Sequence, residues 1–141
     1  MSWLLDADVL SQPAKARGDS RVIAWLNREK DRCYTSSVVI AQLAYWVRSK
    51  EGRQRRALQE WLTELLEALE GRIHNFNVSI AHVWAEQEHI LEAAGARMPM
   101  EDSYIAATAR RHGLTIATGN DKDFQRPGIK VFNPFKELPP I

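Results

Sequence analysis

Cysteine is almost absent from this chain, since Cys33 is the only one among 141 residues. One thiol cannot form an internal disulfide or a cysteine-based zinc cluster. Cys33 lies in the sequence RCYT at residues 32–35, a pattern typical of a strand. The sequence therefore predicts that this thiol packs in the core rather than acting as a nucleophile.

Long apolar runs are also missing, and no segment approaches the roughly 20 residues needed to cross a bilayer. The apolar residues 3–5 are followed at once by Asp6 and Asp8, which interrupt any export signal. The chain is 45% hydrophobic and 26% charged, an ordinary composition for a globular protein. We therefore expect a single domain over residues 1–141 and a cytoplasmic protein that does not enter the membrane.

Several catalytic signatures are absent as well. The sequence contains no HExxH, no GxxxxGKS/T, no GxGxxG and no GxSxG. Zincin, P-loop, Rossmann and serine-hydrolase sites are therefore excluded because their residues are missing. The histidines are scattered without metal-site spacing, which leaves the carboxylates as candidate functional groups.

A helix, a strand and several acids follow one another closely between residues 99 and 124. From Asp102, small and apolar residues recur at helical spacing. Gly113 predicts the end of that helix, and residues 115–118 form a short apolar run typical of a buried strand. Residues 119–123 are predicted to be the loop after this strand.

Short apolar runs alternate with amphipathic helices along the rest of the chain. Strands are predicted at residues 3–5, 32–35, 72–76, 115–118 and 129–132. Helices are predicted to be capped by Ser20, by Ser36 or Ser37, and by Ser79, and a long helix over residues 57–69 to stop at Gly71. This alternation favours an α/β fold with a mainly parallel sheet covered on both faces, and two of its helices form a hairpin or clip.

Polar residues gather at the predicted strand ends or face them. They are Asp6, Asp8, Gln42, Asp102, Asn120, Asp121 and Asp123. Because open α/β sheets place their ligands at the carboxyl ends of the strands, we expect these side chains to share one crevice. Clustered carboxylates cannot all ionise in a dry crevice without a cation, and oxygen ligands favour Mg²⁺ or Mn²⁺ over zinc.

Each of these residues also has a structural interpretation. Asp8 and Asp102 each precede a helix that a carboxylate can cap, and Asn120 and Asp121 are ordinary turn residues. The interpretation as a metal site therefore depends on several acids converging at one place.

Basic residues form two groups. The first consists of Arg48, Lys50, Arg53, Arg55 and Arg56 near one predicted turn, and the second of residues 110–112 at a helix end. Such groups commonly form a solvated helix face or complement a helix carboxyl terminus. Beside a nuclease site they would instead contact RNA phosphates.

Four sequence blocks together resemble the PIN domain, especially the VapC and FitB toxins of bacterial toxin–antitoxin pairs. The blocks are LLDADVLS at residues 4–11, TSSVVIAQL at 35–43, DSYIAATA at 102–109 and TGNDKDF at 118–124. The resemblance implies a three-layer fold with five parallel strands, a helical clip for dimerisation, and Mg²⁺-dependent cleavage of RNA. By position it implies that Asp6, Asp102 and Asp123 hold the metal, with Asn120 beside them.

The sequence departs from the family pattern at two places. Where the family has a threonine and an asparagine after its first acid, this chain has Ala7 and Asp8. The second family acid, a glutamate, is Gln42 here, which keeps an oxygen acceptor but loses the charge. Asp8 is a candidate to restore that charge, and Asp121 is a further candidate ligand.

Three functional hypotheses follow. The first is a toxin that cleaves RNA with Mg²⁺ or Mn²⁺ and is weakened by Gln42. The second is a catalytically inactive PIN-domain protein that pairs with an antitoxin or binds RNA. The third is a receiver-like signalling domain, which is disfavoured because the strand at residues 73–76 ends without an aspartate to phosphorylate.

Apolar and aromatic helix residues predict protein partners. Trp46, Trp61, Leu62, Leu65 and Trp84 supply more apolar helix surface than one small sheet needs. We therefore expect a homodimer, together with an antitoxin segment that lies across the clip and sends an arginine into the acid crevice.

Overall fold

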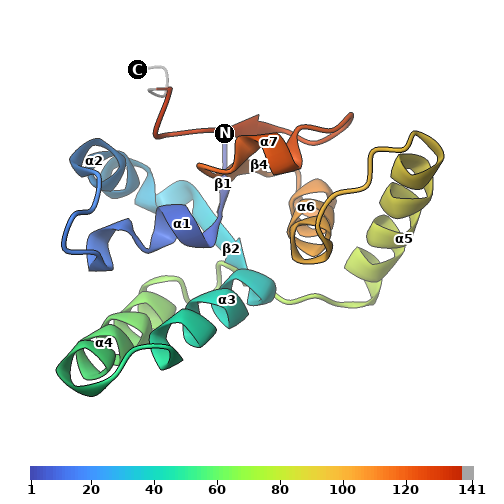
Figure 1. The fold of residues 1–141 in the computed structure, drawn as a ribbon. Coiled ribbons are helices and arrows are strands. Elements are labelled where there is room, and N and C mark those ends of the chain that lie inside the picture. Colours follow the sequence, from blue (N-terminus) through green and yellow to red (C-terminus); the bar gives the residue numbers. More distant parts are fainter. Residues whose placement is uncertain (138–141) are drawn as a thin grey trace.

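Parallel strands form the centre of the molecule in the computed structural model, which describes residues 1–137 (Figure 1). They are β1 (Trp3–Leu5), β2 (Cys33–Ser36), β3 (Ile73–His74), β4 (Thr115–Ala117) and β5 (Val131–Phe132). Their order in the sheet is β3-β2-β1-β4-β5, and every neighbouring pair is parallel. The predicted α/β fold with a five-stranded parallel sheet is confirmed.

Helices flank this sheet. They are α1 (Ala7–Leu10), α2 (Ser20–Glu29), α3 (Ser37–Arg48), α4 (Gly52–Ala68), α5 (Val78–Ala93), α6 (Met100–His112) and α7 (Asp121–Phe124), with 3₁₀ turns η1 (Gln12–Ala14) and η2 (Lys30–Arg32). In Figure 1, α1 and α2 lie on one side of the strands, α5 and α6 lie on the other, and α3 and α4 form a projecting hairpin. This hairpin is the predicted clip. Among residues 1–137, no helix has the length and apolar character needed to span a membrane.

The core forms where α6 packs against the central strands. Leu4 of β1 and Ile116 of β4 have no exposed surface, as expected for strands covered on both faces. Ala106 and Ala107 of α6 are also fully buried. Small side chains let the α6 backbone approach the sheet closely, and the acidic first turn of this helix therefore lies within electrostatic range of Asp6 at the end of β1.

Two predicted helix caps are wrong by one or two residues. Asp19, not Ser20, caps α2, because its carboxylate accepts hydrogen bonds from two backbone N–H groups of the first turn. Asn77, not Ser79, caps α5 in a similar way. A cap must stand in an extended conformation outside the helix, whereas both serines already lie inside it. Gly113 ends α6 as predicted, with a left-handed φ of 66°.

The segment after β4 is not simply a loop. Residues Asp121–Phe124 form one helical turn, and the ring of Phe124 is fully buried. The predicted loop over residues 119–123 is therefore wrong beyond Asn120. Burial of the aromatic ring stabilises a turn that would be too short to persist in isolation.

The aromatic residues of the clip are largely used within the chain. Trp46 and Trp61 pack edge to face with ring centroids 6.2 Å apart, and both are partly buried against the core. The exposed surplus expected at these residues is therefore smaller than predicted, since part of each ring is covered within the chain. The large apolar side chains that α3 and α5 expose are instead Tyr45, Val78 and Ile90. The homodimer itself stays a prediction.

Candidate active site

Asp6 stands directly after β1 and caps α1, a role that the sequence had allowed for Asp8. Its Oδ1 accepts a hydrogen bond from the backbone N–H of Ala7 at 2.9 Å, and its Oδ2 accepts one from the Thr118 hydroxyl at 2.8 Å. Burial raises the pKa of this carboxyl group, and the two hydrogen bonds partly oppose the rise. The ends of β1 and β4 thus hold one carboxylate in a fixed orientation.

Asp8 lies in α1, two residues after Asp6, and contacts the segment after β4. Its Oδ2 accepts a hydrogen bond from the backbone N–H of Gly119 at 2.8 Å, while its Oδ1 is buried and has no partner among residues 1–137. Burial, followed by the charge of Asp6, raises the pKa of Asp8 to about 6. Gly119 is required for this approach, since a Cβ atom there would lie 2.7 Å from Oδ2. A buried carboxylate oxygen without a partner is costly, and a nearby cation would offset that cost.

Asp102 lies in the first turn of α6 but does not cap the helix. Its pKa is raised to about 6, first by burial and then by the charges of Asp6, Asp123, Glu101 and Asp8. Together with Asp102, these four carboxylates come from three helices and the end of β1. All four lie close enough to Asp102 to act on its charge. We call the five carboxylates together the acid cluster.

The two aspartates of α7 have different surroundings. Asn120 Nδ2 donates a hydrogen bond to Asp123 Oδ2 at 2.6 Å, and the charge of Asp123 acts on Asp102. Asp121 Oδ1 instead accepts a hydrogen bond from Asn133 Nδ2 at 3.3 Å and lies 3.7 Å from Lys136 Nζ. The structure therefore brings Asp123 to the acid cluster and gives Asp121 partners of its own.

Gln42 reaches from α3 to α6. Its Nε2 donates a hydrogen bond to Glu101 Oε1 at 2.8 Å. Glu101 was not among the site residues predicted from the sequence. Its position directly before Asp102 was the only feature that could have indicated it. The contact places a carboxylate beside the position where the family pattern has a glutamate.

The start of α6 is anchored to α5 beneath the acid cluster. Trp84 Nε1 donates a hydrogen bond to Ser103 Oγ at 2.9 Å, and Gln87 Nε2 donates one to the Ser103 carbonyl at 3.0 Å. Ser103 has no exposed surface and directly follows Asp102. These bonds fix the acidic turn without using its carboxylates.

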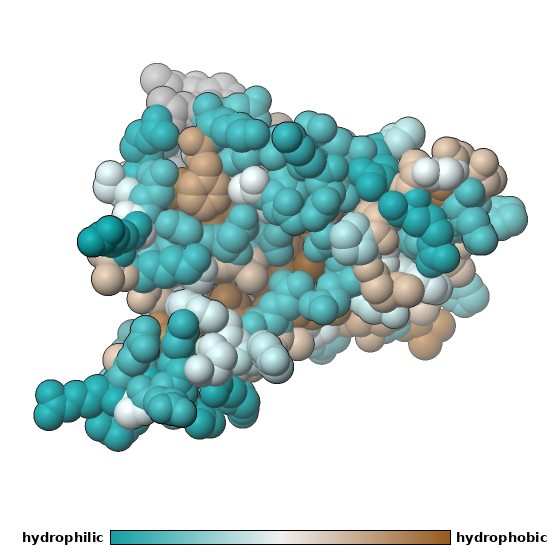
Figure 2. Space-filling model, viewed as in Figure 1, coloured by the Kyte–Doolittle hydropathy of each residue, from teal (hydrophilic) through white to brown (hydrophobic). Residues whose placement is uncertain are grey.

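The two basic groups lie at different places. Arg111 is at the carboxyl end of α6, where its Nε donates a hydrogen bond to Ser79 Oγ at 3.0 Å. Arg110 lies about 12 Å from Asp102 along the helix axis, next to the amino end of β4. The first group instead lies at the tip of the clip, where α3 ends at Arg48 and α4 begins at Gly52, so that Arg53, Arg55 and Arg56 belong to a helix rather than to the predicted turn. Figure 2 shows this tip covered by hydrophilic residues.

The donor atoms of this site are oxygens. Within residues 1–137, no three His, Cys, Asp or Glu side chains converge closely enough to hold one ion directly. The unpartnered oxygen of Asp8 and the raised pKa of Asp102 nevertheless indicate more negative charge than the local hydrogen bonds satisfy. The site therefore fits an oxygen-ligated ion that keeps part of its water shell, as Mg²⁺ usually does.

The stability of the metal-free protein is predicted to fall as the pH rises from about 4 to about 7. Asp8 and Asp102 have pKa values of about 6 when folded, against an ordinary 3.8, so the folded protein binds more protons in this window. Urea unfolding in EDTA at about pH 5 and about pH 7.5 measures the loss, and added Mg²⁺ should reverse it at the higher pH. His74 and His112 act with the opposite sign, because burial lowers their pKa values and the folded protein binds fewer protons at these groups. The loss is therefore assigned by repeating the measurement on Asp102→Asn, whose stability should fall less, and an equal fall in both proteins would contradict the close approach of these carboxylates.

Comparison with known protein families gives one match across most of the chain. The family model described as PIN domain matches residues 3–130. The chain belongs to the PIN-domain family. This PIN-domain assignment agrees with the resemblance of the four sequence blocks, and it leaves the receiver-like hypothesis without support.

Relatives of this PIN-domain chain match it over nearly its whole length. Toxin FitB of Neisseria gonorrhoeae is 33% identical over 137 residues, which cover 95% of this chain and 99% of FitB. VapC ribonuclease Y4jK of Sinorhizobium fredii is 31% identical over 136 residues, which cover 94% and 97% of the two chains. The crystal structure of FitAcB from Neisseria gonorrhoeae superposes with a TM-score of 0.88 at 33% identity, covering 94% of this chain and 98% of that one. The resemblance to VapC and FitB toxins is confirmed.

Proposed function

We propose that this chain is the toxin of a toxin–antitoxin pair and that it cleaves RNA at the acid cluster with Mg²⁺ or Mn²⁺. The observation that carries the proposal is the convergence of carboxylates from separate elements on Asp102. Its relatives include proteins named toxin FitB and VapC ribonuclease. When bound, the cation supplies Lewis-acid chemistry at the scissile phosphate and activates water.

Each residue of the site has a proposed role. Asp6, Asp102 and Asp123 would hold the cation partly through the waters of its shell, since they do not converge closely enough to ligate it together. Thr118 keeps the Asp6 carboxylate in one orientation through its hydroxyl. Asn120 orients Asp123 in the same way. The first basic group, at the tip of the clip, contacts the RNA backbone, rather than Arg110 and Arg111.

The sharpest test uses the two aspartates of α7. Asp123→Asn is expected to lower the rate of RNA cleavage in Mg²⁺ by about 10²-fold or more, because it removes a charge that would hold the ion. Asp121→Asn removes the same charge two residues away, from a side chain paired with Asn133 and Lys136, and should keep most of the activity. Product formation from single-stranded RNA, with Mg²⁺, Mn²⁺ or EDTA, measures both variants.

Two results would count against the proposed site. Cleavage that persists in EDTA would mean that no divalent ion is needed. Equal cleavage by the Asp123→Asn and unchanged proteins, purified in the same way, would point to a contaminating nuclease or to another centre.

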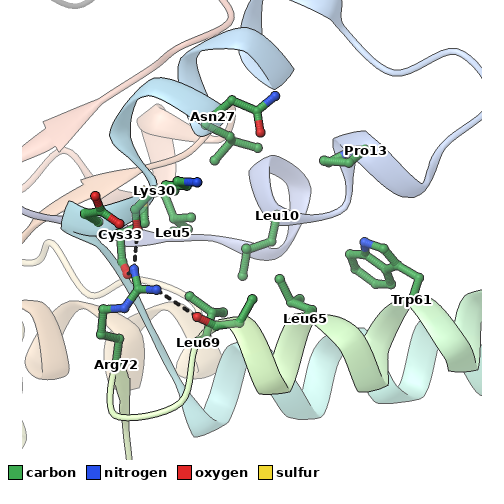
Figure 3. A pocket seen from close by; sticks show the side chains of 13 residues that line it. Leu5, Leu10, Pro13, Asn27, Lys30, Cys33, Trp61, Leu65, Leu69 and Arg72 are labelled. Atoms are coloured by element: carbon green, nitrogen blue, oxygen red, sulfur yellow. Dashed lines mark hydrogen bonds between the residues drawn. The ribbon is translucent and has the colours of Figure 1, made fainter.

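An apolar groove supports the proposal of an antitoxin partner. It has a volume of about 450 Å³ and runs between η1, α2 and α4. Figure 3 shows Leu10 and Leu65 facing one another across it, with Trp61 at one end and Arg72 at the other. Arg72 is fixed there by donating hydrogen bonds to the carbonyls of Cys33 and Ala68 at 3.0 and 2.7 Å. Such a groove suits the apolar face of a partner segment.

The second candidate function is a PIN-domain protein that binds an antitoxin or RNA without cutting. It is favoured by Gln42, which is uncharged and donates its hydrogen bond to Glu101. Expression of the chain without its antitoxin separates the two functions, because a nuclease slows growth and an inactive binding protein does not. Growth that the unchanged chain does not slow would favour the inactive binding protein, whereas growth slowed equally by the unchanged chain and the Asp123→Asn variant would count against cleavage at the acid cluster.

A further inference from the structure

A second groove lies where η1 meets the clip. It encloses about 580 Å³, and its lining includes Lys15, Trp46, Lys50, Gln54, Ala57 and Leu58. We call it the lysine–tryptophan groove. It is separate in its lining from the apolar groove proposed for the antitoxin, since the two share no residue.

The chemistry of this groove differs from that of the apolar one. Its lining carries two ammonium groups and an indole ring, and it contains no carboxylate. Within residues 1–137, neither Lys15 nor Lys50 forms an ion pair. Lys15 Nζ instead lies 5.9 Å from the centroid of the Trp46 ring. Unpaired cations beside an aromatic face suit a flat ring joined to phosphate, which is the chemistry of a nucleotide.

The indole ring is held as a platform. Trp46 packs edge to face against Trp61, with the two ring planes at 87°. Because Trp61 comes from the neighbouring helix α4, the contact restrains the rotation of Trp46 within the clip. A ring that is already oriented loses less entropy when a base stacks on it.

Two elements lead from the acid cluster to the groove, and the charge of Lys15 in the groove acts on the Asp8 carboxylate. On α3, Trp46 stands four residues after Gln42, and Lys50 stands four residues later, just past the helix end. Residues at this spacing lie on one side of a helix, about 6 Å apart along its axis. On the other side, Gln12 of η1 donates a hydrogen bond to the Asp8 carbonyl at 2.9 Å, and Lys15 follows directly after this turn. A strand of RNA that enters the acid cluster therefore meets this groove next.

We propose that the lysine–tryptophan groove binds a nucleotide adjacent to the scissile one in the substrate RNA, with its base on Trp46 and flanking phosphates on Lys15 and Lys50. This inference rests on the proposed function, because it assigns a subsite to the same substrate. An antitoxin peptide is the competing occupant. The lack of a carboxylate in the lining and the two ammonium groups, which form no ion pair within residues 1–137, favour the anionic RNA, whereas the leucine-lined groove fits an apolar peptide better.

Binding of a labelled single-stranded RNA of about eight nucleotides, followed by fluorescence anisotropy, tests the subsite. All proteins carry Asp102→Asn so that the RNA is not cut during titration. Trp46→Leu keeps apolar volume but removes the ring face, and it should weaken binding about tenfold, whereas Trp46→Phe should recover most of the loss. The double change Lys15→Ala and Lys50→Ala should lower the slope of log affinity against log salt by about 1.4.

Lys130→Ala is the matched control, because Lys130 directly precedes the edge strand β5 and does not line the groove. It should leave RNA affinity within about twofold. RNA binding unchanged by the Trp46 and lysine variants would overturn the subsite even if the unchanged protein cuts RNA. Variants that bind antitoxin less tightly but RNA equally well would assign the groove to the antitoxin and also overturn it. Weakened RNA binding by a chain that never cuts RNA would support the subsite while removing the proposed nuclease function.

Discussion

RNA cleavage is expected to fall by about 10²-fold or more when Asp102 is replaced by asparagine, while the metal-free protein becomes more stable. Asp102 is the carboxylate on which the charges of the acid cluster act together. Asparagine keeps the shape of the side chain and loses its charge. The site therefore holds a cation less well, but the repulsion among its carboxylates is also smaller. Because the carboxyl group is only half-buried and partly screened, the gain in unfolding free energy should be on the order of 1 kcal/mol.

Both effects can be measured on one protein preparation. Initial cleavage rates are taken in Mg²⁺, and urea unfolding is followed in EDTA at about pH 7.5. Glu92→Gln removes an exposed carboxylate of α5 outside the acid cluster, and it should leave cleavage intact and stability within about 0.5 kcal/mol. An Asp102→Asn protein that loses stability as well as cleavage would instead give this carboxylate a structural role.

The sheet was predictable because its signals are local. The strands are short segments bounded by turn or cap residues, with an apolar run clearest in β1, and a helix between consecutive strands returns the chain to the same edge. The run at Trp3–Leu5 stops at Asp6, and the run at Thr115–Ala117 stops at Thr118, so two neighbouring strands end in side chains that bond each other. The convergence of Asp6 and Asp102 was expected from this topology, since α6 begins at the edge where β1 ends.

The contacts of the site that depend on helix packing were not predictable. Gln42 and Glu101 are separated by 59 residues, and they meet only because α3 crosses the start of α6. Only the family resemblance favoured Asp123 over Asp121, because the contacts that separate the two depend on the helical turn that buries Phe124. Two of the three predicted caps failed for a related reason, whereas Ser36 caps α3 as predicted. Asp19 and Ser20 are both good caps, and the backbone conformation decides between them.

Gln42→Glu is expected to bind Mg²⁺ or Mn²⁺ at least about tenfold more tightly and to cut single-stranded RNA faster. The attraction between the new carboxylate and the ion, about 4 Å apart at an effective dielectric near 20, is worth roughly 4 kcal/mol. The cost of removing both charges from water offsets part of it. Expression of this variant without an antitoxin should slow growth more than expression of the unchanged chain. Calorimetric titration with Mn²⁺ and cleavage rates measure the two effects in vitro.

The same change should destabilise the protein when metal is absent. It replaces the hydrogen bond from Gln42 to Glu101 with two facing carboxylates, at a cost of about 1–2 kcal/mol. Urea unfolding in EDTA should therefore show a lower midpoint for Gln42→Glu. A midpoint that is equal or higher would mean that the two side chains separate once the amide is lost.

Exchanging the two side chains decides whether Glu101 supplies the charge that Gln42 lacks. Glu101→Gln alone removes a carboxylate from the acid cluster and should weaken Mn²⁺ binding and RNA cleavage. Combining it with Gln42→Glu returns one carboxylate and one amide to the pair, with the hydrogen bond reversed, and should restore both properties to at least the level of the unchanged chain. If Glu101→Gln binds Mn²⁺ as tightly as the unchanged chain, the charge at Glu101 is not used. The buried, unpartnered oxygen of Asp8 then becomes the group that compensates for Gln42.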